Sequence, residues 1–124
     1  MNRFFICHHC GNLVGILHTA GVPILCCGEK MHELVPNTTD AAGEKHLPVA
    51  RVEGDKVHVK VGSVPHPMTE DHSIEWVYLE TSIGGQRKTL GDKPEICFAL
   101  CDGEKPKAVY AWCNLHGLWK ADIH

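Results

Sequence analysis

The chain has 124 residues, enough for one ordinary domain or for a small domain with a smaller appendage. Its 12 Lys and Arg against 15 Asp and Glu give a net charge of −3, which excludes a general basic footprint for nucleic acid. No apolar run is long enough for a membrane span, and the N-terminus lacks the apolar core of a signal peptide, so we expect a cytoplasmic protein with no membrane partner. Seven Cys and ten His are many for this length. An odd Cys count in a reducing compartment favours metal binding or redox chemistry over a disulfide framework.

The first Cys cluster lies near the N-terminus. Cys7 and Cys10 form a CxxC pair, and Cys26 and Cys27 follow an apolar stretch, 13–25, whose Gly and Pro residues predict a hairpin. So short a segment buries too little apolar surface to fold unaided. A metal site of four thiolates would supply the missing stability. Zinc and iron both accept tetrahedral sulfur ligation, so these residues alone leave the metal open.

A mainly β pattern follows a polar, turn-prone segment at 35–40, which is the candidate domain boundary. Apolar and polar residues alternate with a period of two, and Gly-containing turns separate the runs. Short strands at this spacing predict an antiparallel sandwich. Cys97 falls within one of the apolar runs and is expected to be a buried structural thiol. The expected strands are 57–61, 74–79, 96–100 and 108–112.

A thiol and an imidazole lie three residues apart near the C-terminus. Cys113 follows the last predicted strand, and Asn114 and Gly117 favour a tight turn that can aim Cys113 and His116 at one point. A soft thiolate with an imidazole suits iron, copper or zinc. The pair alone is a weak signal, but three more histidines strengthen it.

These histidines lie in predicted loops. His46 is followed closely by a proline, and His66 lies between two prolines that keep it out of a strand ladder. Together with His72, they are poor core residues and good candidate ligands. With Cys113 and His116 they make four imidazoles and one thiolate. Five ligands around a six-coordinate metal leave one position open, which distinguishes a catalytic site from a structural one.

Several separated motifs together identify a family. They occur in the order Gly43-Glu44-Lys45-His46-x-Pro48, Val64-Pro65-His66-Pro67-Met68-x-x-x-His72-x-Ile74-x-Trp76 and Cys113-Asn114-x-His116-Gly117-x-Trp119. The chain resembles the desulfoferrodoxin, or superoxide reductase, family in its two-iron form. The N-terminal Cys pairs resemble desulforedoxin, a rubredoxin-like module that holds one iron.

The resemblance implies a role for each site residue. Four histidines would be equatorial nitrogen ligands of a ferrous iron, with Cys113 as the axial thiolate opposite the open position. Lys45 would attract and orient the anion beside that position, and Glu44 would occupy it in the oxidised resting state. The four N-terminal cysteines would hold a second iron, which zinc can replace. The implied ligands are His46, His66, His72 and His116 for the first metal, and Cys7, Cys10, Cys26 and Cys27 for the second.

The resemblance also implies an architecture and a reaction. Residues 1–36 would form the desulforedoxin-like module, and residues 37–124 an immunoglobulin-like β-sandwich that carries the catalytic site. The enzyme would reduce superoxide to hydrogen peroxide by one electron. A rubredoxin-type protein would be its electron donor, and the chain would form a homodimer.

Two other functions are weighed against this one. A blue-copper electron carrier also combines a β-sandwich with a Cys and a nearby His, but it usually places a weak axial Met just after that His, and no Met follows His116. A zinc-stabilised module on a binding sandwich would explain the four N-terminal cysteines. It gives no reason for the motif that holds Glu44, Lys45 and His46.

Overall fold

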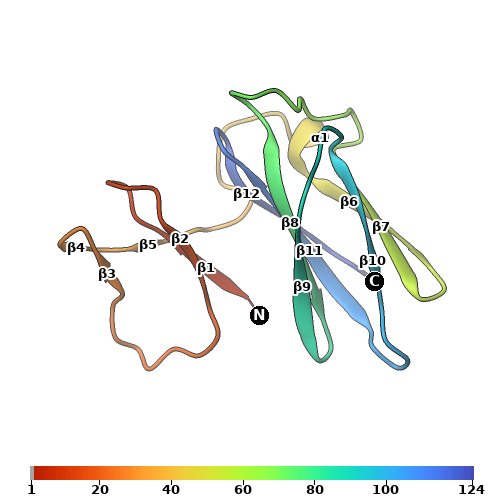
Figure 1. The fold of residues 1–124 in the computed structure, drawn as a ribbon, viewed down its shortest axis with the longest axis horizontal. Helices are drawn as coiled ribbons and strands as arrows, with labels where there is room; N and C mark the ends of the chain where they lie inside the picture. The colour runs from red at the N-terminus through yellow and green to blue at the C-terminus, as the bar shows by residue number, and fades with distance from the viewer. Residues whose placement is uncertain (1) are drawn as a thin grey trace. The chain divides into compact units, whose positions relative to one another are not determined.

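The computed structural model describes residues 2–124 and is mainly β, which confirms the predicted fold class (Figure 1). The chain divides into two compact units, one ending at Val35 and the other spanning Pro36–His124. Within the described residues, no helix is long and apolar enough to cross a bilayer.

The N-terminal unit consists of very short strands around the two Cys pairs. The hairpin predicted for residues 13–25 is wrong. Leu13 pairs instead with Ile6, across the turn that contains Cys7 and Cys10. The first Cys pair therefore lies in the hairpin turn rather than before it. The strands are β1 (Arg3–Ile6), β2 (Leu13–Ile16), β3 (Leu25–Cys26), β4 (Glu29–Lys30) and β5 (His32–Glu33), in the sheets β2-β1-β5 and β3-β4.

The C-terminal unit is the predicted antiparallel sandwich. A three-stranded sheet, β10-β7-β6, packs against a four-stranded sheet, β12-β11-β8-β9. Its helical structure among the described residues is the single turn α1 (Gly43–His46). The strands are β6 (Pro48–Glu53), β7 (Lys56–Val61), β8 (Ile74–Thr81), β9 (Gly84–Thr89), β10 (Glu95–Ala99), β11 (Pro106–Cys113) and β12 (Gly117–Asp122).

The alternating valines of β7 face the core between the sheets. Val57 and Val59 are almost completely buried, and Phe98 of β10 packs with them. His58 points to the opposite face, where it is only partly buried, and Cys97 pairs with it in register. The expectation that Cys97 is a buried core thiol is therefore wrong, because it lies half-buried on the outer face of its sheet.

A β-bulge interrupts β8 close to the C-terminal end of β11. Trp112 pairs with Trp76, but the next residue, Cys113, pairs with Ile74, so Glu75 has no residue opposite it. An extra residue in one strand shifts the phase of its side chains. The bulge brings Ile74 into the core in place of Glu75, which is exposed.

Candidate metal centres

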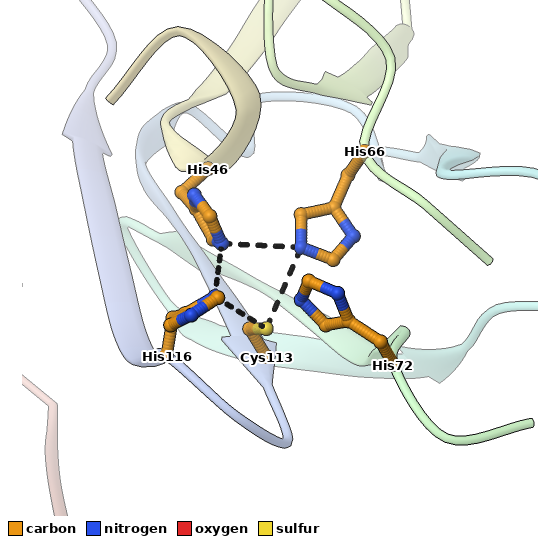
Figure 2. A group of neighbouring side chains, drawn as sticks. All are labelled: His46, His66, His72, Cys113 and His116. Carbon is orange, nitrogen blue, oxygen red and sulfur yellow. Dashed lines mark hydrogen bonds between the residues drawn. The ribbon is translucent and has the colours of Figure 1, made fainter. Parts of the chain in front are cut away.

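Five predicted ligands from four segments converge at one end of the sandwich (Figure 2). His46 ends α1, His66 and His72 lie in the loop between β7 and β8, Cys113 ends β11, and His116 lies in the turn to β12. Their nearest ligand atoms all lie within 4.8 Å of one another. His46, His66 and Cys113 are each at most 3% exposed.

Backbone hydrogen bonds define the tautomers of two of these imidazoles. The Nδ1–H of His46 donates to the carbonyl of Ala42 at 2.7 Å, and the Nδ1–H of His66 donates to the carbonyl of Pro67 at 2.6 Å. In a neutral imidazole, the other ring nitrogen then carries only a lone pair. The two Nε2 atoms nevertheless face each other at 3.2 Å, with no proton to share between them.

The other ligand atoms lie close to these two nitrogen atoms. His116 presents Nδ1 at 3.0 Å from Nε2 of His46, and Cys113 places Sγ 3.4 Å from Nε2 of His66. The buried Nε2 of His72 has no hydrogen-bond partner. Two nitrogen ligands at right angles, each about 2.1 Å from one metal ion, lie about 3.0 Å apart. The spacing and the converging lone pairs therefore fit a bound cation.

Burial keeps these groups in the forms that suit a metal. Burial lowers the pKa of His66 to about 4 and also lowers the pKa of His46. Both imidazoles are therefore neutral at pH 7, with lone pairs free to bind a metal. Burial raises the pKa of the Cys113 thiol. A bound cation reverses that effect, because coordination deprotonates a thiol.

Neighbouring side chains hold the ligand-bearing segments in place. Trp119 stacks on His46, with ring centroids 5.0 Å apart, and its indole N–H donates to the carbonyl of His116 at 3.1 Å. The side-chain amide of Asn114 accepts a hydrogen bond from the N–H of Ser73 and donates to the carbonyl of Asp71. The turn that follows Cys113 is thus tied to the loop that carries His72.

A glycine brings the segment before His66 against α1. The N–H of Gly62 donates to the carbonyl of Leu47, and the N–H of Val64 donates to the carbonyl of Glu44, both at 2.9 Å. Gly62 has a φ of +86°, and an added Cβ would lie 2.7 Å from the carbonyl oxygen of Lys45 and 2.3 Å from that of Val64. This role of Gly62 was not predicted from the sequence, although a glycine directly after the alternating valines is a signal for a special backbone position.

Glu44 and Lys45, the two predicted residues that are not ligands, lie exposed on α1. They share this single turn with His46, so their position follows from that of the ligand. The pKa of His46 is lowered chiefly by burial, and the positive charge of Lys45 contributes to the same shift. The positive charge of Lys45 therefore acts on the His46 imidazole.

The four N-terminal cysteines form the second group. Their Sγ atoms all lie within 4.8 Å of one another, and those of Cys10 and Cys26 are 3.6 Å apart. Sulfur ligands about 2.3 Å from a tetrahedral metal lie about 3.8 Å apart, so the spacing fits one ion. Cys27 has a φ of +53°, and this left-handed conformation lets consecutive cysteines serve one site.

The protonation of this group also fits a bound cation. Hydrogen bonding, first from the N–H of Cys10, lowers the pKa of Cys7 to about 6. The thiols of Cys10 and Cys7 raise the pKa of Cys27 to about 12. Four neighbouring sulfurs cannot all ionise without positive charge between them. All seven cysteines lie within the described residues, and none forms a disulfide.

All nine predicted ligands thus gather in two groups, one of mixed nitrogen and sulfur donors and one of sulfur alone. An immunoglobulin-like sandwich with the first group, preceded by a small unit with the second, is the architecture of a non-haem metalloprotein with two different candidate sites. A sequence model described as Desulfoferrodoxin matches residues 38–122. The chain belongs to the desulfoferrodoxin family, as its motifs predicted.

Known proteins resemble the chain over nearly its whole length or over about two thirds of it. It is 48% identical to the desulfoferrodoxin of Syntrophotalea carbinolica, over 94% of this chain and 92% of that protein. The solved superoxide reductase of Treponema pallidum is 42% identical, with a TM-score of 0.82 over 98% of both chains. The superoxide reductase of Giardia intestinalis is 35% identical, with a TM-score of 0.52 over 65% of this chain and 98% of that one.

Proposed function

We propose that the chain is a superoxide reductase whose iron is held by the mixed group in the C-terminal unit. The observation that carries the proposal is the convergence of ring nitrogens from four imidazoles and one sulfur on one point, with no proton between the Nε2 atoms of His46 and His66. Family membership and the solved superoxide reductases support the same conclusion.

The reaction joins one superoxide, one electron and two protons into one hydrogen peroxide. When bound, iron supplies the one-electron couple and a position for the substrate. His46, His66, His72, Cys113 and His116 would hold it, because imidazole suits iron and a thiolate donates electron density to it. Burial keeps His46, His66 and Cys113 in place and limits the access of water to them.

Lys45 is the proposed binding residue for superoxide. The substrate is an anion and the chain carries a net charge of −3, so local positive charge must overcome the overall repulsion. The exposed ammonium of Lys45 can attract the anion and donate hydrogen bonds to its oxygens. Glu44, on the same turn, is the proposed carboxylate that occupies the substrate position in the oxidised resting state.

The N-terminal unit is proposed to hold a second iron, with zinc as a possible replacement. The geometry of its four sulfurs fits either metal, because both accept tetrahedral thiolate ligation. A rubredoxin-type protein is the proposed electron donor, since each turnover consumes one electron. That the chain works as a homodimer stays a prediction of the family resemblance.

The electron-carrier alternative fits the geometry less well. A blue-copper site needs two imidazoles, one thiolate and a weak axial ligand. The structure instead brings four imidazoles to the same point, two more than such a site needs. This favours a larger coordination number than the carrier needs.

The stoichiometry of superoxide consumption tests the proposal. A reductase supplied with an electron donor forms one hydrogen peroxide for each superoxide and no dioxygen. A dismutase forms one hydrogen peroxide and one dioxygen for every two superoxide ions. Consumption that stops when the donor is exhausted supports the proposal, and dioxygen release in step with peroxide contradicts it.

Replacing Lys45 tests its role in attracting the substrate. In Lys45→Ala, we expect the rate of reaction with superoxide at low salt to fall by about tenfold or more, and its dependence on salt to weaken. Lys107→Ala is the matched control, because Lys107 is exposed near the start of β11, roughly 20 Å along the strand from Cys113. An unchanged rate in Lys45→Ala at low salt would exclude the steering role.

A further inference from the structure

The bulge in β8 places an extra residue opposite the junction between Trp112 and Cys113, whose thiol belongs to the mixed group. Trp112 pairs with Trp76 and Cys113 pairs with Ile74, so Glu75 alone occupies the extra position. Bulges often lie next to functional sites, where they redirect a side chain. Regular alternation would direct Glu75 towards the core, but the bulge leaves it exposed.

A hydrogen bond gives the carboxylate of Glu75 a defined position. Its Oε1 accepts from the indole Nε1–H of Trp112 at 3.0 Å. The indole is itself fixed, because its ring lies parallel to that of Trp76, with 6.4 Å between the centroids and 15° between the planes. Trp112 is joined directly to Cys113. Because consecutive side chains of a strand point to opposite faces, the negative charge lies on the outer face of the sheet, one residue along from the buried thiol.

We infer that Glu75, held by Trp112, is a positioning residue that places a negative charge on the outer face of the sheet, behind the strand end that presents the Cys113 thiolate, and so lowers the reduction potential of the metal bound there. The inference rests on the proposed function, since it takes the metal to be an iron that changes its charge by one electron.

The direction of the effect follows from electrostatics. A nearby negative charge stabilises the more positive of two oxidation states, so it favours ferric over ferrous iron. Because Glu75 is exposed, solvent and salt screen its influence, and the effect is modest. A lower potential makes transfer of the electron to superoxide more favourable and re-reduction by the donor less so.

A redox titration of the thiolate-to-iron absorption band of the intact, iron-loaded chain tests this. Glu75→Gln keeps an oxygen that accepts from Trp112 and removes only the charge. At low salt and a fixed ambient potential, we expect the ferrous-to-ferric ratio to rise about threefold, equivalent to about 30 mV for one electron. In 1 M salt, where the Debye length is about 3 Å, the difference from wild type shrinks.

Glu80→Gln is the matched control. Glu80 lies on the same strand and accepts a hydrogen bond from the hydroxyl of Tyr110, but it is roughly 16 Å along β8 from Glu75. It should leave the potential unchanged. Trp112→Phe releases the Glu75 carboxylate and should raise the potential by less than Glu75→Gln does.

Equal potentials in wild type and Glu75→Gln at low salt, or an equal shift in Glu80→Gln, would overturn the inference. A shift in Glu75→Gln that does not change with salt would also overturn it, since it would indicate altered packing instead of charge. The proposed function has its own test. A wild-type protein without an oxidisable thiolate-to-iron band contradicts the iron site. A band whose reduction potential is the same in wild type and Glu75→Gln contradicts only the role of Glu75.

Discussion

The two metal-binding groups are built in opposite ways. In the N-terminal unit, Cys10 and Cys27 are exposed, and three of the five strands are only two residues long. In the C-terminal unit, Cys113 is fully buried against a continuous core that includes Phe98 and Leu79. We therefore expect the first group to hold its unit together, and the second to be placed on a scaffold that folds without it. Such a scaffold can leave a coordination position for substrate, because its metal is not needed to stabilise the fold.

Metal removal is the strongest way to separate the two units. Structural tetrathiolate sites contribute on the order of 10 kcal/mol to folding, far more than a core this small can replace. We expect chelation to abolish the protection of backbone amides in β1 and β2 against hydrogen exchange, while β7 and β11 keep theirs. Hydrogen exchange followed by NMR or mass spectrometry measures both at once.

Single thiols sharpen the same test without a chelator. Cys10→Ser should destabilise the N-terminal unit and leave the C-terminal absorption band intact. Cys101→Ser, which replaces an exposed cysteine outside both groups, is its control. Loss of protection in β7 and β11 on chelation would show that the sandwich also depends on its metal.

Gly62 tests how firmly the scaffold holds the mixed site. A Cβ at this position would meet three carbonyl oxygens at 2.3 to 2.8 Å, so we expect Gly62→Ala to lower the free energy of unfolding of the C-terminal unit by more than about 3 kcal/mol. Gly103 has a similar φ of +81° but open space around it, so Gly103→Ala should cost only about 1 kcal/mol. Denaturant titrations of the two variants give the difference, and equal losses would rule out the carbonyl contacts as the cause.

The smallest expected effect is a pH dependence within the sandwich. The Thr81 hydroxyl, at 2.6 Å, and the N–H of Cys101 lower the pKa of Glu104. The pKa of Glu104 is lower in the folded than in the unfolded chain, so its ionised carboxylate stabilises the fold. This stabilisation is complete above the ordinary Glu pKa of about 4.3 and is lost as the pH falls through the folded value.

Urea titrations of the C-terminal unit between pH 6 and pH 3 measure this effect. The difference in stability between wild type and Glu104→Gln should shrink as the pH falls. Glu95→Gln, which changes an exposed carboxylate on β10, should not reproduce it. A wild-type advantage that stays constant over this range would contradict the account.

The sequence predicted the class of fold because apolar alternation is strong where strands are buried on one face, as at Val57 and Val59. It missed β9, whose residues Gln86, Arg87 and Lys88 offer no apolar period at this edge of the sheet. It also misplaced the N-terminal hairpin. There, apolar residues on both sides of the Cys7–Cys10 turn leave the choice of partner to tertiary contacts.

The site residues were easier to predict from the sequence than the residues that position them. Unusual residue types in motifs, such as His66 between two prolines, are visible in a sequence. The roles of Gly62 and Glu75 depend on backbone geometry, namely a close approach of three carbonyls and a shift of register. A one-residue slip in pairing between distant strands leaves little trace in local pattern.

Metal content combined with a visible spectrum, taken before and after oxidation, tests the central claim most directly. We predict two irons per chain, a rubredoxin-like spectrum from the N-terminal unit, and a thiolate-to-iron band that develops only on oxidation and is lost in Cys113→Ser. A folded C-terminal unit that binds zinc or copper in preference to supplied ferrous iron, or iron that shows no such band, would contradict the account.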